Sequence, residues 1–175
     1  MTRAVLSLGS NLGDREGHLR QAVRVLGRCV ERASGIYETP PWGDADQPAY
    51  LNAVVLVSDP AAAPHDWLQR ARAVETAALR VRDPERRFGP RTMDVDVIVV
   101  RDADGRPVLS ADPELTLPHP RAHLRAFVLR PWHDIEPAAE LPGHGPIAAL
   151  LAGPALAADL AALSPRPDLA LESTA

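Results

Sequence analysis

The chain has 175 residues, which suits a single domain, and a formal net charge of −4, so no excess of positive charge favours a nucleic-acid binder. Its single cysteine excludes an internal disulfide and is typical of a reducing compartment. No segment is long and apolar enough to span a bilayer. We therefore expect a cytoplasmic protein with no membrane or nucleic-acid partner. We also expect a monomer, although none of these properties determines the oligomeric state.

The first half of the chain alternates between strand and helix patterns. In chain order it predicts a strand at 3–9, a helix from Glu16 to about Cys29, strands at 30–39 and 50–58, and a helix at 64–80. Pro and Gly residues predict a loop before the strand at 50–58.

The second half predicts fewer regular elements. In chain order they are a loop at 80–92, a strand at 93–100, a hairpin through "DADG" to "RPVLS", a loop at 113–123, a short helix around Arg125–Trp132, and Ala-rich helical turns near 146–163. The residues from Ser164 are polar and rich in Pro. We expect them to form a loose tail, 164–175, beyond a single domain at 1–163.

The β-α-β-β-α-β order is that of the ferredoxin-like split unit. The sequence therefore predicts an α+β fold with this core, an added hairpin strand and C-terminal helices. Right-handed crossovers make the first strand parallel to the second and the third parallel to the fourth. One edge of the sheet should then carry Ser10-Asn11, the "TPPWG" loop, Tyr50 with Asn52, and Asp94 with Asp96.

Asp94 and Asp96 lie two residues apart in an apolar strand, so their side chains share one face. Two neighbouring carboxylates repel each other, and a divalent cation removes that conflict. Mg²⁺ is usually held by one or two carboxylates together with substrate phosphates. A solvated edge strand, on which charges oppose aggregation, is the simpler explanation of the pair alone.

An arginine-rich loop precedes the two aspartates and favours the metal interpretation. Its guanidinium groups match phosphate oxygens, and carboxylates with metal opposite arginines form a polyphosphate site. A solvated run of charges remains the alternative for this loop alone. The glycine-rich "SLGSNLGDR" lacks the Gly-Lys-Ser/Thr ending of a P-loop, so phosphate binding must depend on Arg and metal.

Three further side chains are candidates for ligand binding. Tyr50 and Asn52 face one way at the start of a strand and offer a stacking face and an amide to a flat heterocycle. An ordinary strand end that carries Tyr and Asn is the commoner explanation of the pair alone. His119 stands rigidly between two prolines, although it can equally be an ordinary surface histidine. Zinc binding by His119 and His123 is disfavoured, because Pro120 prevents one helix from holding both.

Five stretches occur in the order of a known family. They are "SLGSNLGDR", "YETPPWG", "DQPAYLNAVV", "RFGPRTMDVDVI" and "LPHPRAHLRAFVLRP". Together, over about residues 3–140, they resemble the 6-hydroxymethyl-7,8-dihydropterin pyrophosphokinases of the folate pathway. The resemblance implies a ferredoxin-like fold and an Mg-dependent transfer of pyrophosphate from ATP to the pterin hydroxymethyl group, which gives AMP, with two Mg²⁺ ions.

The resemblance also implies roles for individual residues. Asp94 and Asp96 match metal-binding positions, and Arg80 and Arg91 match arginines of the transfer step. The implied pterin-binding residues are Thr39, Pro40, Trp42, Tyr50, Asn52, Phe88 and Phe127. The implied ATP-binding residues are Glu75, Arg82, Arg91, Ile98, His119 and Arg125.

Some positions depart from the family pattern. Phe88 replaces a common tryptophan, Arg72 a frequent glutamine, and Glu114 stands where some members have a basic residue. An RNA-binding module is the main non-enzymatic alternative, because ferredoxin-like sheets also bind bases. Aromatic residues are sparse here and no RNA-binding signature is present. A regulatory ligand-binding domain would not need the paired carboxylates.

Overall fold

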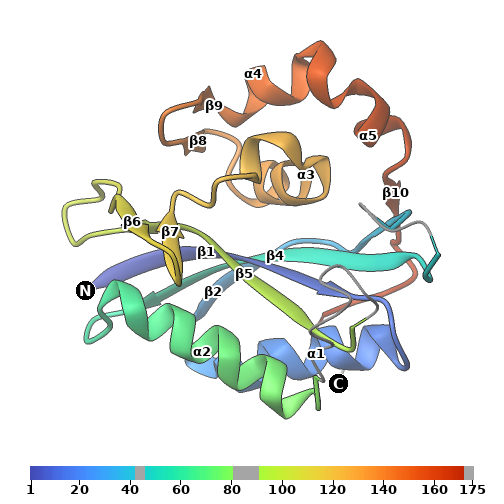
Figure 1. Ribbon diagram of the computed structural model, residues 1–175, viewed down its shortest axis with the longest axis horizontal. Helices are drawn as coiled ribbons and strands as arrows, with labels where there is room; N and C mark the ends of the chain where they lie inside the picture. Colours follow the sequence, from blue (N-terminus) through green and yellow to red (C-terminus); the bar gives the residue numbers. More distant parts are fainter. Residues whose placement is uncertain (42–45, 81–90, 172–175) are drawn as a thin grey trace.

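The computed structural model describes residues 1–41, 46–80 and 91–171. Its central strand, β1 (Thr2–Ser10), is antiparallel to β4 (Tyr50–Asp59) on one side and to β5 (Asp94–Arg101) on the other. The short strands β2 (Val30–Ala33) and β3 (Tyr37–Thr39) pair antiparallel with the far side of β4. These directions and this strand order confirm the predicted ferredoxin-like core (Figure 1).

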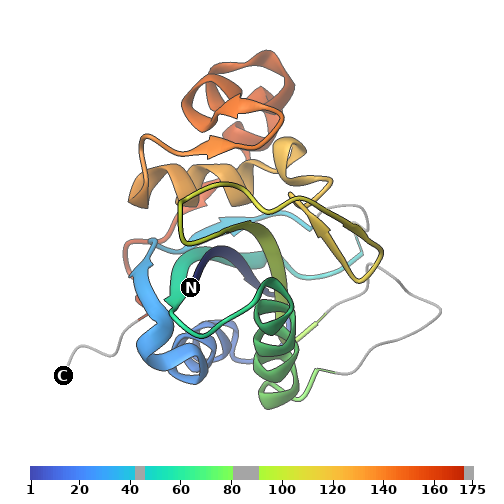
Figure 2. The same ribbon diagram turned by 90° about the vertical axis from the view of Figure 1, so that its left-hand side faces the viewer.

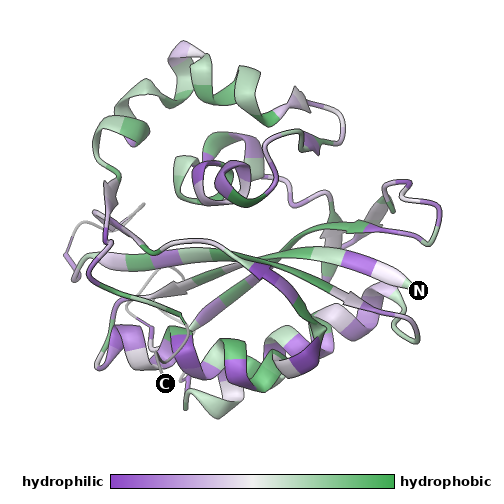
Figure 3. Cartoon of the chain, turned by 180° about the vertical axis from the view of Figure 1, so that it is seen from behind, coloured by the Kyte–Doolittle hydropathy of each residue, from purple (hydrophilic) through white to green (hydrophobic). Residues whose placement is uncertain are grey.

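Helices cover both faces of the sheet. Helices α1 (Arg15–Leu26) and α2 (Pro64–Ala77) lie on one face, and α3 (Ala126–Ile135) lies on the other (Figure 2). The mainly apolar helical turns α4 (Ile147–Ala152) and α5 (Ala157–Ala161) pack beyond α3 (Figure 3). Within the described ranges, no helix has the length and apolar character needed to cross a membrane.

The shorter elements complete the chain. They are the 3₁₀ turns Gly27–Cys29, Ala122–Leu124 and Pro154–Leu156, and the strands β6 (Ser110–Asp112), β7 (Leu115–Leu117), β8 (Glu140–Leu141), β9 (Gly145–Pro146) and β10 (Ser164–Pro165). Local signals in the sequence set the helix ends. The Asp14 side chain accepts a hydrogen bond from the N–H of Gly17 and caps α1, and Pro64 opens α2.

The alternation of side chains along each strand builds two cores. Trp67 of α2 is fully buried with Leu6 and Val55 beneath α1 and α2. Trp132 of α3 is fully buried with Val54 on the opposite face. The apolar part of each central strand is therefore covered on both sides, which explains the apolar runs in the sequences of these strands.

The face of the sheet beneath α3 is apolar at one end and polar at the other. On β4, Tyr50 and Asn52 precede Val54 on that face, and on β5, Asp94 and Asp96 precede Ile98. Helix α3 covers the apolar end, because only that end offers surface whose burial is favourable. The polar end lies beside α3 and forms the floor of a cavity.

The strand predicted at 30–39 is broken into β2 and β3. The backbone N–H of Ser34 donates to the carbonyl of Val54 at 2.9 Å, and the Ser34 hydroxyl oxygen accepts from the Val54 N–H at 2.9 Å. A side chain thus replaces a ladder bond, and Gly35 lets the chain bend before β3 begins.

The predicted hairpin after β5 forms only in part. The turn at 102–105 is present, and Val108 donates to the carbonyl of Val100 at 2.8 Å, but the return run pairs no further than this. Pro107 has no N–H to contribute to a ladder. The next hairpin is instead β6–β7, which occupies part of the stretch predicted to be loop.

Residues 164–171, which their composition predicts to be loose, are bound to the domain. Strand β10 pairs with β3, and the N–H of Arg166 donates to the carbonyl of Ile36 at 2.8 Å. The Leu171 side chain is buried in the core beneath α1 and α2. The open backbone groups of the edge strand β3 explain this docking, because an added strand satisfies them.

Leu79, which follows the C-cap residue Ala78 of α2, has the left-handed conformation, with φ of 53°. Its N–H donates to the carbonyl of Thr76, and the next N–H, of Arg80, donates to that of Glu75, which makes a Schellman motif. The Leu79 side chain is 81% exposed, so little packing compensates for its conformation. We expect Leu79→Gly to raise the free energy of unfolding by about 0.5–1 kcal/mol, because glycine adopts this conformation without the steric cost. Urea unfolding measures this change in the free energy of unfolding, and a Leu79→Gly variant less stable than wild type would contradict the prediction.

Candidate active site

A cavity of about 590 Å³ lies over the polar end of the sheet. Its floor comes from β1, β4 and β5, one wall from α2, and the opposite wall from residues 113–127. The described lining residues are Ser7, Gly9, Thr39, Pro40, Tyr50, Asn52, Leu68, Ala71, Arg72, Glu75, Arg80, Arg91, Asp94, Val95, Asp96, Pro113, Glu114, His119, Pro120, Arg121, Arg125 and Phe127. Five arginines and four carboxylates among them make this a strongly charged space.

Gly9 forms the middle of the floor. On β1 it pairs with Asn52 of β4 on one side and with Asp94 of β5 on the other. A Cβ atom at this position would stand 3.5 Å from the Asn52 amide oxygen and 3.6 Å from the Tyr50 ring. The missing side chain therefore leaves open space between the Asn52 side of the cavity and the Asp94 side.

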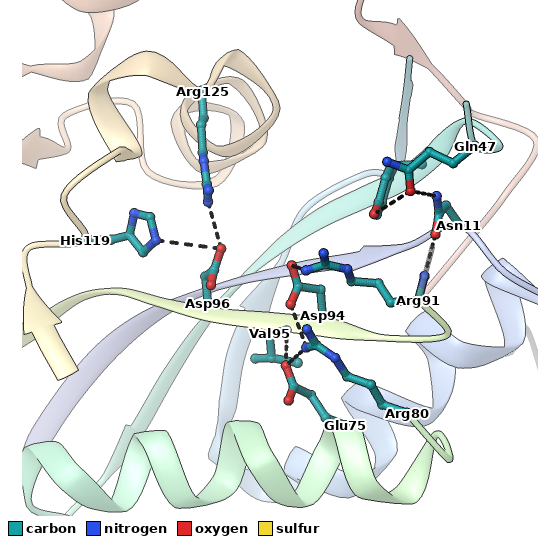
Figure 4. A network of polar contacts seen from close by, with 11 residues as sticks. Asn11, Gln47, Glu75, Arg80, Arg91, Asp94, Val95, Asp96, His119 and Arg125 are labelled. Carbon is teal, nitrogen blue, oxygen red and sulfur yellow. Dashed lines mark hydrogen bonds and ion pairs between the residues drawn. The ribbon is translucent and has the colours of Figure 1, made fainter. Parts of the chain in front are cut away.

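Asp94 lies between two arginines. Its carboxylate accepts from Arg80 at 2.6 Å through one oxygen and from Arg91 at 3.0 Å through the other (Figure 4). Arg80 also pairs with Glu75, a buried carboxylate of α2 that accepts the N–H of Val95 at 3.1 Å. Helix α2 and strand β5 thus hold the two arginines and two carboxylates in one charge-balanced group.

Asp96 faces the same cavity from the next position on that face. Arg125, just before α3, donates to its carboxylate at 2.7 Å, and the His119 Nε2 atom lies 3.8 Å from the same oxygen. Burial lowers the pKa of His119, although the negative charge of Asp96 opposes this effect. The His119 Nδ1 atom accepts from the N–H of Arg121 at 3.1 Å, so the neutral ring carries its proton on Nε2, toward Asp96.

The Asn52 side of the cavity is less charged. The Asn52 amide donates to the Thr39 hydroxyl at 2.9 Å, and both residues are buried. Tyr50 lies beside them, where burial is the main factor that raises the pKa of its hydroxyl. Phe127 faces the cavity from α3, with the Arg125 guanidinium 5.6 Å from the centre of its ring. Amide, hydroxyl and aromatic groups are suited to a flat polar heterocycle.

Two departures from the family pattern meet across the cavity. The Arg72 guanidinium of α2 lies 3.6 Å from the Glu114 carboxylate of the β6–β7 turn. Both side chains are more than half exposed, so the pair contributes little to stability. The arginine at position 72 is thus paired with the acidic residue at position 114.

The structure brings most of the predicted site residues together. Thr39, Pro40, Tyr50, Asn52, Glu75, Arg80, Arg91, Asp94, Asp96, His119, Arg125 and Phe127 all line the cavity. The predicted residues Trp42, Arg82 and Phe88 lie outside the described ranges.

Of the predicted site residues that the structure describes, Ile98 is the one whose side chain does not line the cavity. That side chain is fully buried in the core beneath α3, two positions beyond Asp96 on the same face. Its backbone carbonyl accepts the N–H of His119 at 2.8 Å. The contribution of Ile98 to the cavity is therefore to hold the backbone of the opposite wall.

Sequence reasoning missed Ser7 and Gly9 as parts of the floor. Ser7 pairs with Asp96 and Gly9 with Asp94, so these two small residues lie beside the two carboxylates. The signal was present in the first strand, where both interrupt an apolar run on the same face as Val5.

The comparison with protein families decides the relationship. A sequence model of 7,8-dihydro-6-hydroxymethylpterin-pyrophosphokinase (HPPK) matches residues 5–137, a range that contains every lining residue of the cavity. The chain belongs to this family. The resemblance predicted from the five sequence stretches is thereby confirmed.

Individual HPPK relatives agree with this assignment. The chain is 48% identical over 159 residues to the 2-amino-4-hydroxy-6-hydroxymethyldihydropteridine pyrophosphokinase of Mycobacterium bovis. The aligned residues cover 87% of this chain and 84% of the relative. It is 39% identical over 136 residues to the enzyme of the same name from Bacillus subtilis. The aligned residues cover 75% of this chain and 77% of that relative.

Solved structures with HPPK in their names share the fold. A crystal structure of HPPK-DHPS in complex with substrates superposes with a TM-score of 0.60 at 12% identity, over 85% of this chain and 42% of that one. Wild-type Plasmodium falciparum HPPK-DHPS gives 0.56 at 13% identity, over 85% and 44%. The chain spans less than half of these longer proteins, and the low identity supports the ferredoxin-like fold alone.

Proposed function

We propose that this cavity transfers the pyrophosphoryl group of ATP to the hydroxymethyl group of 6-hydroxymethyl-7,8-dihydropterin, giving the pterin diphosphate and AMP. Membership of the HPPK family supports this reaction in tetrahydrofolate synthesis. The observation that supports it most strongly is the division of one cavity into two sides. A nearly neutral side suited to a heterocycle and a charged side meet at Gly9, which has no side chain.

The pterin is assigned to the side of Tyr50 and Asn52. The Asn52 amide and the Thr39 hydroxyl offer hydrogen bonds to the edge of a flat ring, and Phe127 offers a stacking face. Pro40 lines the same part, at the end of β3. In this arrangement the hydroxymethyl group points across Gly9 toward the aspartates.

The nucleotide is assigned to the charged side. Arg80, Arg91 and Arg125 lie around the aspartates and match the charge of phosphate oxygens. His119 and Glu75 complete that side, with Ile98 holding His119 through its carbonyl. The proposal extends to Trp42, Arg82 and Phe88 by family resemblance alone.

Asp94 and Asp96 have the chemistry expected of Mg²⁺ ligands. Both carboxylates line the cavity, and each is now neutralised by arginine, a role that a cation can take over. Within the described ranges no group of three or more His, Cys, Asp or Glu side chains could hold a metal by itself. A pair of carboxylates instead suits ions that complete their shell with phosphate and water, and the family resemblance gives two of them.

The residues act mainly by position and charge. The pterin hydroxyl oxygen forms a bond to the β-phosphorus, the bond from that phosphorus to the oxygen of the AMP leaving group breaks, and the hydroxyl proton passes to solvent. Mg²⁺, when bound, supplies charge neutralisation of the phosphates. Asn52 and Tyr50 hold the pterin for in-line attack, and Arg80 and Arg91 neutralise the charge that develops on the transferred group.

A product assay tests the proposal. Purified protein with ATP, Mg²⁺ and 6-hydroxymethyl-7,8-dihydropterin should release AMP and the pterin diphosphate in equal amounts, resolved by ion-exchange chromatography. Removal of divalent ions by EDTA should stop the reaction, and excess Mg²⁺ should restore it. The 6-methyl pterin, which lacks the attacking hydroxyl, is the matched control and should give no AMP. Release of ADP in place of AMP would contradict pyrophosphoryl transfer.

A further inference from the structure

Asn11 is a buried residue at the end of β1 whose side chain does not line the cavity. We propose that Asn11 is a positioning residue that fixes the pterin side of the site relative to the phosphate side. This inference rests on the function proposed above and adds a residue to which the proposed reaction assigns no role.

The Asn11 amide joins two segments that are far apart in the sequence. Its oxygen accepts the backbone N–H of Arg91 at 2.8 Å, and its nitrogen donates to the Gln47 side chain at 2.9 Å (Figure 4). The same nitrogen donates to the Pro48 carbonyl at 3.1 Å. The backbone N–H of Asn11 also donates to the carbonyl of Arg91 at 3.2 Å. One residue thus makes four hydrogen bonds, two to each segment.

Each of these segments leads directly into one side of the cavity. Arg91 carries the guanidinium that binds Asp94. Pro48 stands two residues before Tyr50, whose hydroxyl lies 3.4 Å from the Gln47 amide oxygen. A shift of the Asn11 amide would therefore change the placement of Arg91 and Tyr50 relative to each other.

Asparagine is specifically suited to this position. An amide provides an acceptor and two donors in one plane, and all of them are used here. Asn11 is only 1% exposed, so water cannot replace a lost partner. Aspartate would keep the acceptor for the Arg91 N–H but lose both donors toward 47–48. Alanine would lose the acceptor and the donors alike. The two substitutions therefore separate the two functions of the amide.

The test compares steady-state kinetics of Asn11→Asp and Asn11→Ala. We expect Asn11→Asp to raise KM for the pterin at least tenfold, with KM for ATP and kcat within threefold of wild type, because only the 47–50 segment is released. Asn11→Ala should show the same rise in KM and lower kcat at least tenfold, because Arg91 loses its anchor. Thr2→Val is the matched control: Thr2 is buried at the opposite end of β1, and it accepts from Trp67 and donates to the Ala62 carbonyl. Thr2→Val should lose stability without either kinetic change.

A second readout needs no substrate. Backbone amides in 47–51 should exchange with deuterium faster in ligand-free Asn11→Asp than in wild type or Thr2→Val. If an Asn11 variant does not fold, Gln47→Leu replaces it in the test. This substitution removes one hydrogen-bond partner of Asn11 and should raise KM for the pterin in the same way. A rise below tenfold in folded Asn11→Asp, or unchanged exchange, overturns the inference. If wild type makes no pterin diphosphate while exchange still accelerates, the proposed function fails, and what stands is that Asn11 holds the 47–51 segment against Arg91.

Discussion

Asp96→Asn should fold as wild type does and lose about a hundredfold or more of its turnover. The substitution preserves the size of the side chain and removes the charge that we assign to metal binding. A hundredfold loss corresponds to about 2.7 kcal/mol of transition-state stabilisation. Asp96 is half-buried at the edge of a cavity, so the effect on stability should be small. Turnover at saturating ATP, pterin and Mg²⁺ measures the first quantity, and thermal unfolding the second.

The control for this variant is Asp104→Asn. Asp104 lies in the turn that follows β5, and within residues 1–41, 46–80 and 91–171 its carboxylate forms an ion pair with the exposed Arg106. It should keep wild-type turnover, which separates the loss of a particular carboxylate from the loss of any negative charge. An Asp96→Asn enzyme that retains more than a tenth of wild-type turnover would rule out a metal-holding role in the transition state.

The predictable part of this molecule is the part whose signals are local. Period-2 and period-3.6 patterns indicate the central strands and the two helices that face them, and the order of these elements implies the ferredoxin-like topology. That topology is sufficient to bring Tyr50, Asn52, Asp94 and Asp96 to one edge of the sheet, as the strand pairing confirms. Their distances and partners required the structure, because Arg80 and Arg125 reach the aspartates from other elements.

The features that escaped prediction depend on partners remote in the sequence. Strand β10 forms because the edge of β3 offers backbone groups, which no property of Ser164 or Pro165 reveals. The interruption between β2 and β3 depends on Ser34 reaching the backbone of Val54 in another strand. The role of Asn11 likewise requires Gln47 and Arg91 to be adjacent in space, although all three belong to stretches that the sequence singled out.

The identity of the substrate is tested most directly at Asn52, because general phosphate chemistry does not involve it. In the proposed arrangement Asn52 forms hydrogen bonds with the edge of the pterin ring and makes no contact with ATP. Asn52 is 3% exposed and its amide already donates to Thr39, so the side chain is held in one orientation. Asn52→Ala should weaken pterin binding by about 1–3 kcal/mol, the usual effect of leaving a buried hydrogen-bonding group unpaired. That range is about 5- to 150-fold in Kd.

Asn52→Asp should also weaken pterin binding, because a carboxylate cannot donate to Thr39 or to the ring, and its charge would lie across Gly9 from Asp94. Ser34→Ala is the control for loss of a buried hydrogen bond beside β4, since Ser34 does not line the cavity. Calorimetric titration of each ligand alone should show Kd for ATP within about threefold of wild type in both Asn52 variants, a difference below 1 kcal/mol. If ATP binding collapses while pterin binding survives, the two substrates are assigned to the wrong sides of Gly9. If both survive, Asn52 has no part in recognition, and Tyr50 and Phe127 must select the ring by stacking alone.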